Sequence, residues 1–120
     1  MNQFTIAILQ LASAGADQQA NLAKGDFYCR HAAAKGADLA LFPEMWNIGY
    51  SFFNPAQPGA REAWAEQAVP LDGPFVRHFQ DLARELNMAI GLTFLEKTDL
   101  GPRNTLALID RSGKIGLTYA

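Results

Sequence analysis

The sequence predicts an α/β protein in which short buried strands alternate with amphipathic helices. The strand-like runs are short and mostly apolar, and they cover residues 4–11, 38–42, 88–95, 104–109 and 114–119. Helical spacing of apolar residues appears over residues 18–35 and again from residue 74 onward. The expected order is strand, helix, strand, a long loop with a short helix, a second full helix, and three strands.

The first three elements are expected to form one βαβ unit. Residues 4–11 (FTIAILQL) are almost uniformly apolar, which is typical of a strand covered on both faces inside a sheet. The helix has a face of unusually small side chains, made by Leu22, Gly25, Cys29, Ala32 and Ala33, and Gly36 ends it. Residues 38–42 (DLALF) then form a strand that Pro43 ends, so parallel, right-handed pairing is favoured.

The middle of the chain is expected to be a loop. Gly49, Asn54-Pro55 and Pro58-Gly59 interrupt regular structure between residues 47 and 59, with aromatic residues among them. A short helix is expected over residues 60–68.

Asp72-Gly73-Pro74 opens the second full helix, because proline suits a first helical turn. Its apolar stripe consists of Phe75, Phe79, Leu82, Ala83 and Leu86. Residues 96–103 are expected to be a polar linker between two strands, and residues 110–113 a hairpin turn into the last strand. The chain should form one unit, residues 1–120.

Composition excludes several classes of protein. Ten basic and twelve acidic residues are spread along the chain, which does not indicate a nucleic-acid partner. No run approaches the roughly 20 apolar residues that span a bilayer, and the start, Met1 to Phe4, lacks the basic region of a leader, so we expect a cytoplasmic protein without a membrane partner. The single cysteine and the widely separated His31 and His78 do not predict a disulfide or a metal site.

Glu44 is the best candidate for chemistry. It follows a buried strand and a proline, and in open α/β sheets functional groups gather at the carboxyl ends of the strands. Trp46 and Tyr50 lie just beyond it, and an apolar surround would raise the pKa of a carboxylate and make it a usable general base. The alternative is a surface glutamate that caps a turn or forms a salt bridge.

Residues 36–44 (GADLALFPE), followed by Gly49-Tyr50, resemble the glutamate motif of the nitrilase superfamily of carbon–nitrogen hydrolases. Other similar features occur in order along essentially the whole chain: Gln10, Asn21, Asp72-Gly73-Pro74, and the hairpin from Asn104-Thr105 through Gly113 to Tyr119. The resemblance therefore rests on much more than one Pro-Glu pair.

The resemblance implies the first half of an α-β-β-α sandwich that is incomplete at the C-terminus. Complete members of the superfamily pair into dimers through the helices on one face. In such enzymes a cysteine thiolate attacks an amide or nitrile carbon, a glutamate acts as general base, and a lysine stabilises the tetrahedral intermediate. By resemblance Glu44 is the catalytic base, Tyr50 and Trp46 border the substrate, and no metal or organic cofactor is implied.

The implied activity is hydrolysis of a small amide or carbamoyl compound, with nitrile hydrolysis or amide formation as alternatives. The family's lysine follows the hairpin tyrosine by two positions, which here is one residue beyond Ala120, and the cysteine comes later still. We therefore expect the 120-residue chain alone to be inactive. A non-catalytic fragment or a subunit that needs a complementary half remains a further alternative.

Other residues could in principle replace the missing groups. Cys29 lies on the apolar face of a helix and is expected to be a core residue. Lys97 and Lys114 flank turns and are expected at the surface, and His31 and His78 are expected to have structural roles.

Overall fold

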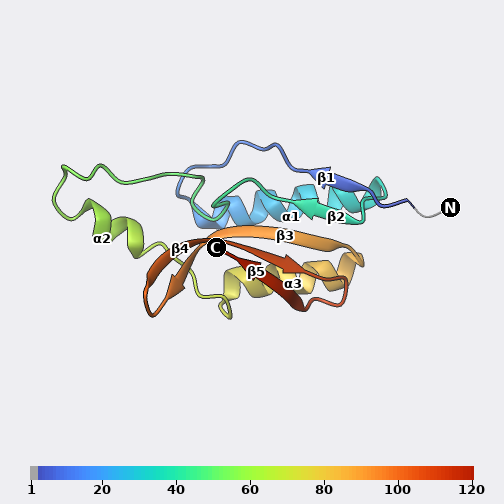
Figure 1. Ribbon diagram of the computed structural model, residues 1–120. Helices are drawn as coiled ribbons and strands as arrows, with labels where there is room; N and C mark the ends of the chain where they lie inside the picture. Colours follow the sequence, from blue (N-terminus) through green and yellow to red (C-terminus); the bar gives the residue numbers. More distant parts are fainter. Residues whose placement is uncertain (1–2) are drawn as a thin grey trace.

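The computed structural model describes residues 3–120. Met1 and Asn2, on which the expectation about a leader partly rests, lie outside the described residues. A single five-stranded sheet runs in the order β1-β2-β3-β4-β5 (Figure 1). Its strands are β1 (Ile6–Ile8), β2 (Leu39–Leu41), β3 (Ala89–Thr98), β4 (Gly101–Ile109) and β5 (Ile115–Tyr119). The helices are α1 (Gln18–Ala34), α2 (Ala60–Ala65) and α3 (Pro74–Leu86). The predicted α/β class is confirmed.

The first three strands are parallel, and each is joined to the next through a helix. Asp17 caps α1 by accepting a hydrogen bond from the backbone N–H of Ala20 at 3.0 Å. Pro74 occupies the first turn of α3, as expected. Because both crossovers move in the same direction across the sheet, both helices lie on one face, where they contact each other.

The helix-covered face holds the main core. From α3, Val76 and Phe79 are fully buried against Ile90, Leu92 and Phe94 of β3. The predicted stripe of α3 is therefore its packed face.

The small-residue face of α1 has a packing explanation. A Cβ added to Gly25 would lie 2.9 Å from both the Phe42 ring and the Trp46 indole nitrogen. The helix thus approaches the carboxyl end of β2 too closely for any larger side chain. Asn21 shares the buried part of this face with Gly25, Cys29 and Ala32, whereas Leu22 is only partly buried.

The other face of the sheet, which we call the open face, is not covered by any helix of the described residues. The strand register places many large apolar residues on this face, among them Ile6, Ile8, Leu39, Leu41, Leu106, Leu108, Leu117 and Tyr119. Ile8 is 66% exposed and Tyr119 is 74% exposed. The expectation that residues 4–11 form a strand covered on both faces inside the sheet was wrong for this chain, since β1 is a three-residue edge strand with one bare face.

The expectation of a polar linker over residues 96–103 was also wrong. Strands β3 and β4 continue through this segment and pair as far as Thr98 and Gly101, leaving a two-residue turn. The hydroxyl of Thr98 closes the turn by donating to the Gly101 carbonyl at 2.7 Å. The residues are polar because this end of the hairpin is more exposed, not because the strands stop. The predicted turn over residues 110–113 is present.

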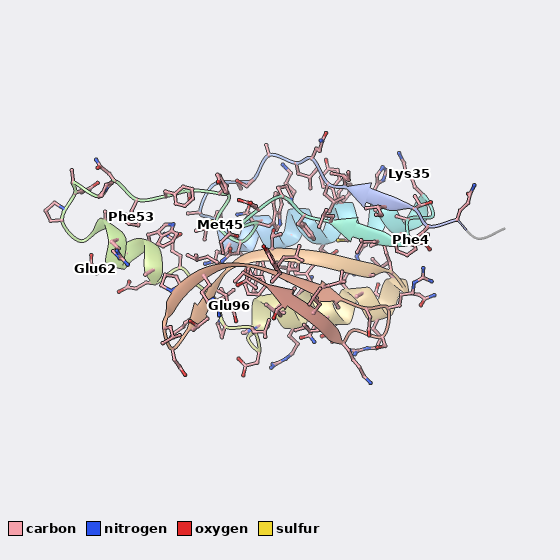
Figure 2. The ribbon with its side chains drawn as sticks, viewed as in Figure 1. Phe4, Lys35, Met45, Phe53, Glu62 and Glu96 are labelled. Carbon is pink, nitrogen blue, oxygen red and sulfur yellow. The ribbon has the colours of Figure 1, made fainter. Side chains whose placement is uncertain are left out.

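The loop after β2 and helix α2 form an arm that projects from the body (Figure 1), in a molecule with extents of 56 × 27 × 22 Å. Figure 2 shows Phe53 and Glu62 out on this arm, while Met45 lies against the body. Trp64 holds the arm together, because its ring stacks on Phe52 and its indole N–H donates to the Ser51 carbonyl at 2.7 Å.

Candidate active site

Glu44 lies at the carboxyl edge of the parallel strands. Strand β2 ends at Leu41, and Glu44 follows Pro43 at the start of an irregular turn. Its side chain is exposed, and the amide Nδ2 of Asn104 in β4 lies 3.4 Å from its carboxylate Oε2. Among the described residues, the carboxylate therefore contacts an amide donor and forms no ion pair with a cation.

Two hollows meet at Glu44. The larger has a volume of about 330 Å³ and is lined by Leu41, Phe42, Glu44, Thr93, Asn104, Thr105, Leu106, Tyr119 and Ala120. The smaller has a volume of about 110 Å³ and is lined by Leu11, Ser13, Pro43, Glu44, Trp46, Gly49 and Tyr50. Both are mostly apolar, and Glu44 is the one acidic side chain among the residues lining them. A third hollow of about 410 Å³ beside them has no titratable side chain in its lining.

The two aromatic residues expected at the substrate differ in their surroundings. Tyr50 is 57% exposed and lies edge-on to Phe52 at the base of the arm. Trp46 is fully buried, and its indole N–H donates to the Asn21 carbonyl at 2.8 Å. Both residues line the smaller hollow, Tyr50 as an exposed side chain and Trp46 as a buried one.

The sequence model of the family described as carbon–nitrogen hydrolase matches residues 5–120. The chain belongs to this family. Residues 36–44, which resemble the family's glutamate motif, form the segment that brings Glu44 to the sheet edge.

Individual members of the carbon–nitrogen hydrolase family are similar over nearly the whole chain. An N-carbamoylputrescine amidase of Solanum lycopersicum is 34% identical over 91% of this chain, and an arylacetonitrilase of Aspergillus niger is 28% identical over 96% of it. The crystal structure of XC1258 from Xanthomonas campestris, a CN-hydrolase superfamily protein, matches 99% of the chain with a TM-score of 0.81 at 24% identity, which shows the shared fold. The chain spans about 35% of the amidase's length and 40% of that crystal chain.

Cys29 is a core residue, as predicted. It is fully buried on α1, and burial, followed by the nearby negative charge of Asp26, raises the pKa of its thiol to about 12. A thiol with that pKa is not a nucleophile near neutral pH. Cys29 therefore does not substitute for the family's cysteine.

The lysines and histidines also occupy the expected places. Lys97, Lys114 and His31 are exposed. His78 joins α3 to α1 through a 2.8 Å contact between its Nε2 and Asp26 Oδ2, which is remote from the hollows at Glu44.

Sequence reasoning assigned no place at the site to three polar residues around Glu44, although Asn104 was among the residues that carry the family resemblance. Asn104 contacts the carboxylate, and Thr93 and Asn47 anchor the turn that carries it. A polar residue at position 104, two residues before Leu106 on the same face, was the available signal. Its meaning depended on the β3–β4 register, which the sequence does not reveal.

Within residues 3–120 no helix combines the length and apolar character that crossing a membrane requires. Over the same residues, no three His, Cys, Asp or Glu side chains gather in an arrangement that could hold a metal ion.

Proposed function

We propose that the whole protein containing this chain hydrolyses a non-peptide carbon–nitrogen bond in a small amide or carbamoyl compound, with Glu44 as general base. The observation that carries the proposal is the position of Glu44 in a chain of the carbon–nitrogen hydrolase family: it lies at the carboxyl edge of the sheet and lines two apolar hollows. A carboxylate in that position can take a proton from a nucleophile that approaches over the sheet edge.

The strand register supports a place for the family's lysine. Leu106 lies opposite Tyr119 in the antiparallel pair of β4 and β5. If the pairing continues, the second residue after Tyr119 lies opposite Asn104, on the face that carries Glu44. A lysine there would bring its ammonium group beside the carboxylate, where it can stabilise an oxyanion. The nucleophilic cysteine is proposed to come from later in the chain.

The substrate class follows from the relatives. Similarity to N-carbamoylputrescine amidases favours an amide or carbamoyl carbon. Similarity to an arylacetonitrilase supports nitrile hydrolysis as the second candidate. Tyr50 is proposed to contact the substrate and Trp46 to support that contact from beneath.

Residues 1–120 alone are proposed to be inactive, because Glu44 would lack both of its partners. The apolar residues of the open face support the view that another part of the protein covers them. A cytoplasmic location and a homodimer are proposed from the family resemblance, and light scattering of the whole protein tests the second of these.

The experiment compares the whole protein with Glu44→Gln and a control, Glu62→Gln, in the release of ammonia from a panel of small amides, ureido compounds and nitriles. Glu62 is an exposed glutamate on α2. Glu44→Gln should lower turnover by roughly 10²- to 10⁴-fold, and Glu62→Gln should leave it unchanged. Full turnover by Glu44→Gln would overturn the proposed role, and turnover of nitriles alone would select the second candidate.

A further inference from the structure

The turn that carries Glu44 has a strained backbone. Met45 has a φ of 50° and Tyr50 a φ of 37°, a region that side-chain-bearing residues rarely adopt. Gly49 between them has a φ of 74°, and a Cβ there would lie 2.0 Å from the Ser13 hydroxyl oxygen. Such a backbone persists only when its surroundings hold it, and strain of this kind is concentrated at functional sites.

Thr93 holds the turn on both sides of Glu44. Its hydroxyl on β3 donates to the carbonyl of Pro43, the residue before Glu44. The backbone N–H of Trp46 donates back to Thr93, at 3.2 Å from the carbonyl oxygen and 3.3 Å from the hydroxyl oxygen. Thr93 is buried, so these bonds do not compete with water. Glu44 and Met45 are therefore enclosed between two attachments to one residue.

Asn47 provides the second anchor. It is fully buried, and its Oδ1 accepts a 2.8 Å hydrogen bond from the Leu95 N–H, two residues along β3 from Thr93. Its Nδ2 lies 3.3 Å from the side-chain oxygen of Gln18 on α1. Its backbone carbonyl accepts a 3.0 Å bond from Asn21, a second fully buried amide. The turn is thus attached to both β3 and α1.

We propose that Thr93 and Asn47 are positioning residues that fix the direction of the Glu44 carboxylate toward the hollow it shares with Asn104. This inference rests on the proposed role of Glu44 as base. Within residues 3–120, the exposed side chain of Glu44 has one hydrogen-bond contact, the long one to Asn104, so its direction depends on the backbone beneath it. A displacement of about 1 Å in a reacting group can lower turnover about 10²-fold.

The test uses Thr93→Val in the whole protein, because valine matches the shape and suits a strand but lacks the hydroxyl. Thr93→Ser restores the hydroxyl and should recover activity. The matched control is Thr98→Val on the same strand, whose hydroxyl also joins a backbone carbonyl and a backbone N–H, but at the far hairpin. Measurements are kcat, KM, thermal unfolding, and amide hydrogen exchange over residues 43–50.

Thr93→Val is expected to lower kcat roughly 10- to 100-fold with little change in KM. Hydrogen exchange over residues 43–50 should accelerate while exchange in α1 and α3 does not. Thr93→Ser and Thr98→Val should resemble the unmodified protein. A Thr93→Val enzyme with unchanged kcat and unchanged exchange in the turn would overturn the inference.

Asn47→Asp repeats the test independently if Thr93→Val does not fold. The aspartate keeps an oxygen that accepts from the Leu95 N–H, but it lacks the amide N–H that donates to Gln18. The same fall in kcat is expected. The failure of this inference can be told apart from the failure of the proposed function. Full activity of Glu44→Gln would show that Glu44 is not the base. The hydrogen-exchange result would still decide whether Thr93 holds the turn.

Discussion

The two faces of the sheet differ in how deeply their apolar side chains are buried. On the helix-covered face, Phe79 of α3 and Ile90 and Phe94 of β3 are fully buried in one core. On the open face, Ile8 and Leu117 are equally apolar but more than half exposed. Glu44 lies at the rim between the two, where the turn after β2 passes from one face to the other. The difference teaches that this chain encodes one finished layer of core and the apolar half of a second.

The largest effect is expected from the finished face. Phe79→Ala removes a fully buried ring that contacts Phe42 and Phe75 at centroid distances of 5.3 and 5.5 Å. It should lower the free energy of unfolding of the whole protein by about 3–5 kcal/mol. Urea denaturation followed by circular dichroism measures this, and a loss below about 1 kcal/mol would mean that the face is not the core described here.

The open face gives the next largest effect. Leu117→Ala should cost about 2–5 kcal/mol in the whole protein if that face is covered there. Leu100→Ala is the control, since Leu100 is 95% exposed at the hairpin tip and its change should stay within about 0.5 kcal/mol. Equal, small effects of both substitutions would show that the open face stays uncovered in the whole protein. They would contradict the existence of a second core layer.

A smaller effect is expected where α1 meets the turn. Gly25→Ala forces a methyl group against Phe42 and Trp46, and overpacking of this kind costs about 1–3 kcal/mol. Because Trp46 belongs to the turn that carries Glu44, turnover should fall as well as stability. Unfolding and kinetic measurements on the same preparation check this. A Gly25→Ala protein with unchanged stability and turnover would show that there is room for a methyl group between α1 and the two rings.

The smallest effect is electrostatic and is expected at Asp26 on α1. Burial tends to raise the pKa of Asp26, but hydrogen bonds from Arg30 and His78 outweigh it and hold the pKa below the ordinary value of 3.8. A lowered pKa gives stability that is present above the ordinary value and is lost as the pH falls through the lowered one. Because Arg30 is half exposed, the contribution is about 0–1 kcal/mol. Asp26→Asn should flatten the loss of stability below pH 3.8, and an unchanged acid profile would contradict this.

The sequence was sufficient for the parts of the fold that local patterns determine. The spacing of Phe75 and Phe79 predicted the buried face of α3, and the position of Glu44 after an apolar strand and a proline predicted its place at the sheet edge. Residues 96–103 were misread because exposed hairpin strands and polar linkers have the same composition. The anchors Thr93 and Asn47 could not be predicted, because their partners lie about 50 residues away and are brought together only by the fold.

Thiol labelling tests most directly the central proposal, which is that Glu44 lies at the rim of a core layer completed by the rest of the protein. The labelling rate of Ile8→Cys on the open face is compared with that of Lys114→Cys at an exposed turn, both in the whole protein. Peptide mass identifies the labelled site, and the buried Cys29 gives the rate of a fully covered thiol. The account predicts labelling at position 8 at least about 100-fold slower than at position 114, because a covered thiol reacts only when the structure opens. Equal, rapid labelling at both positions would contradict the claim.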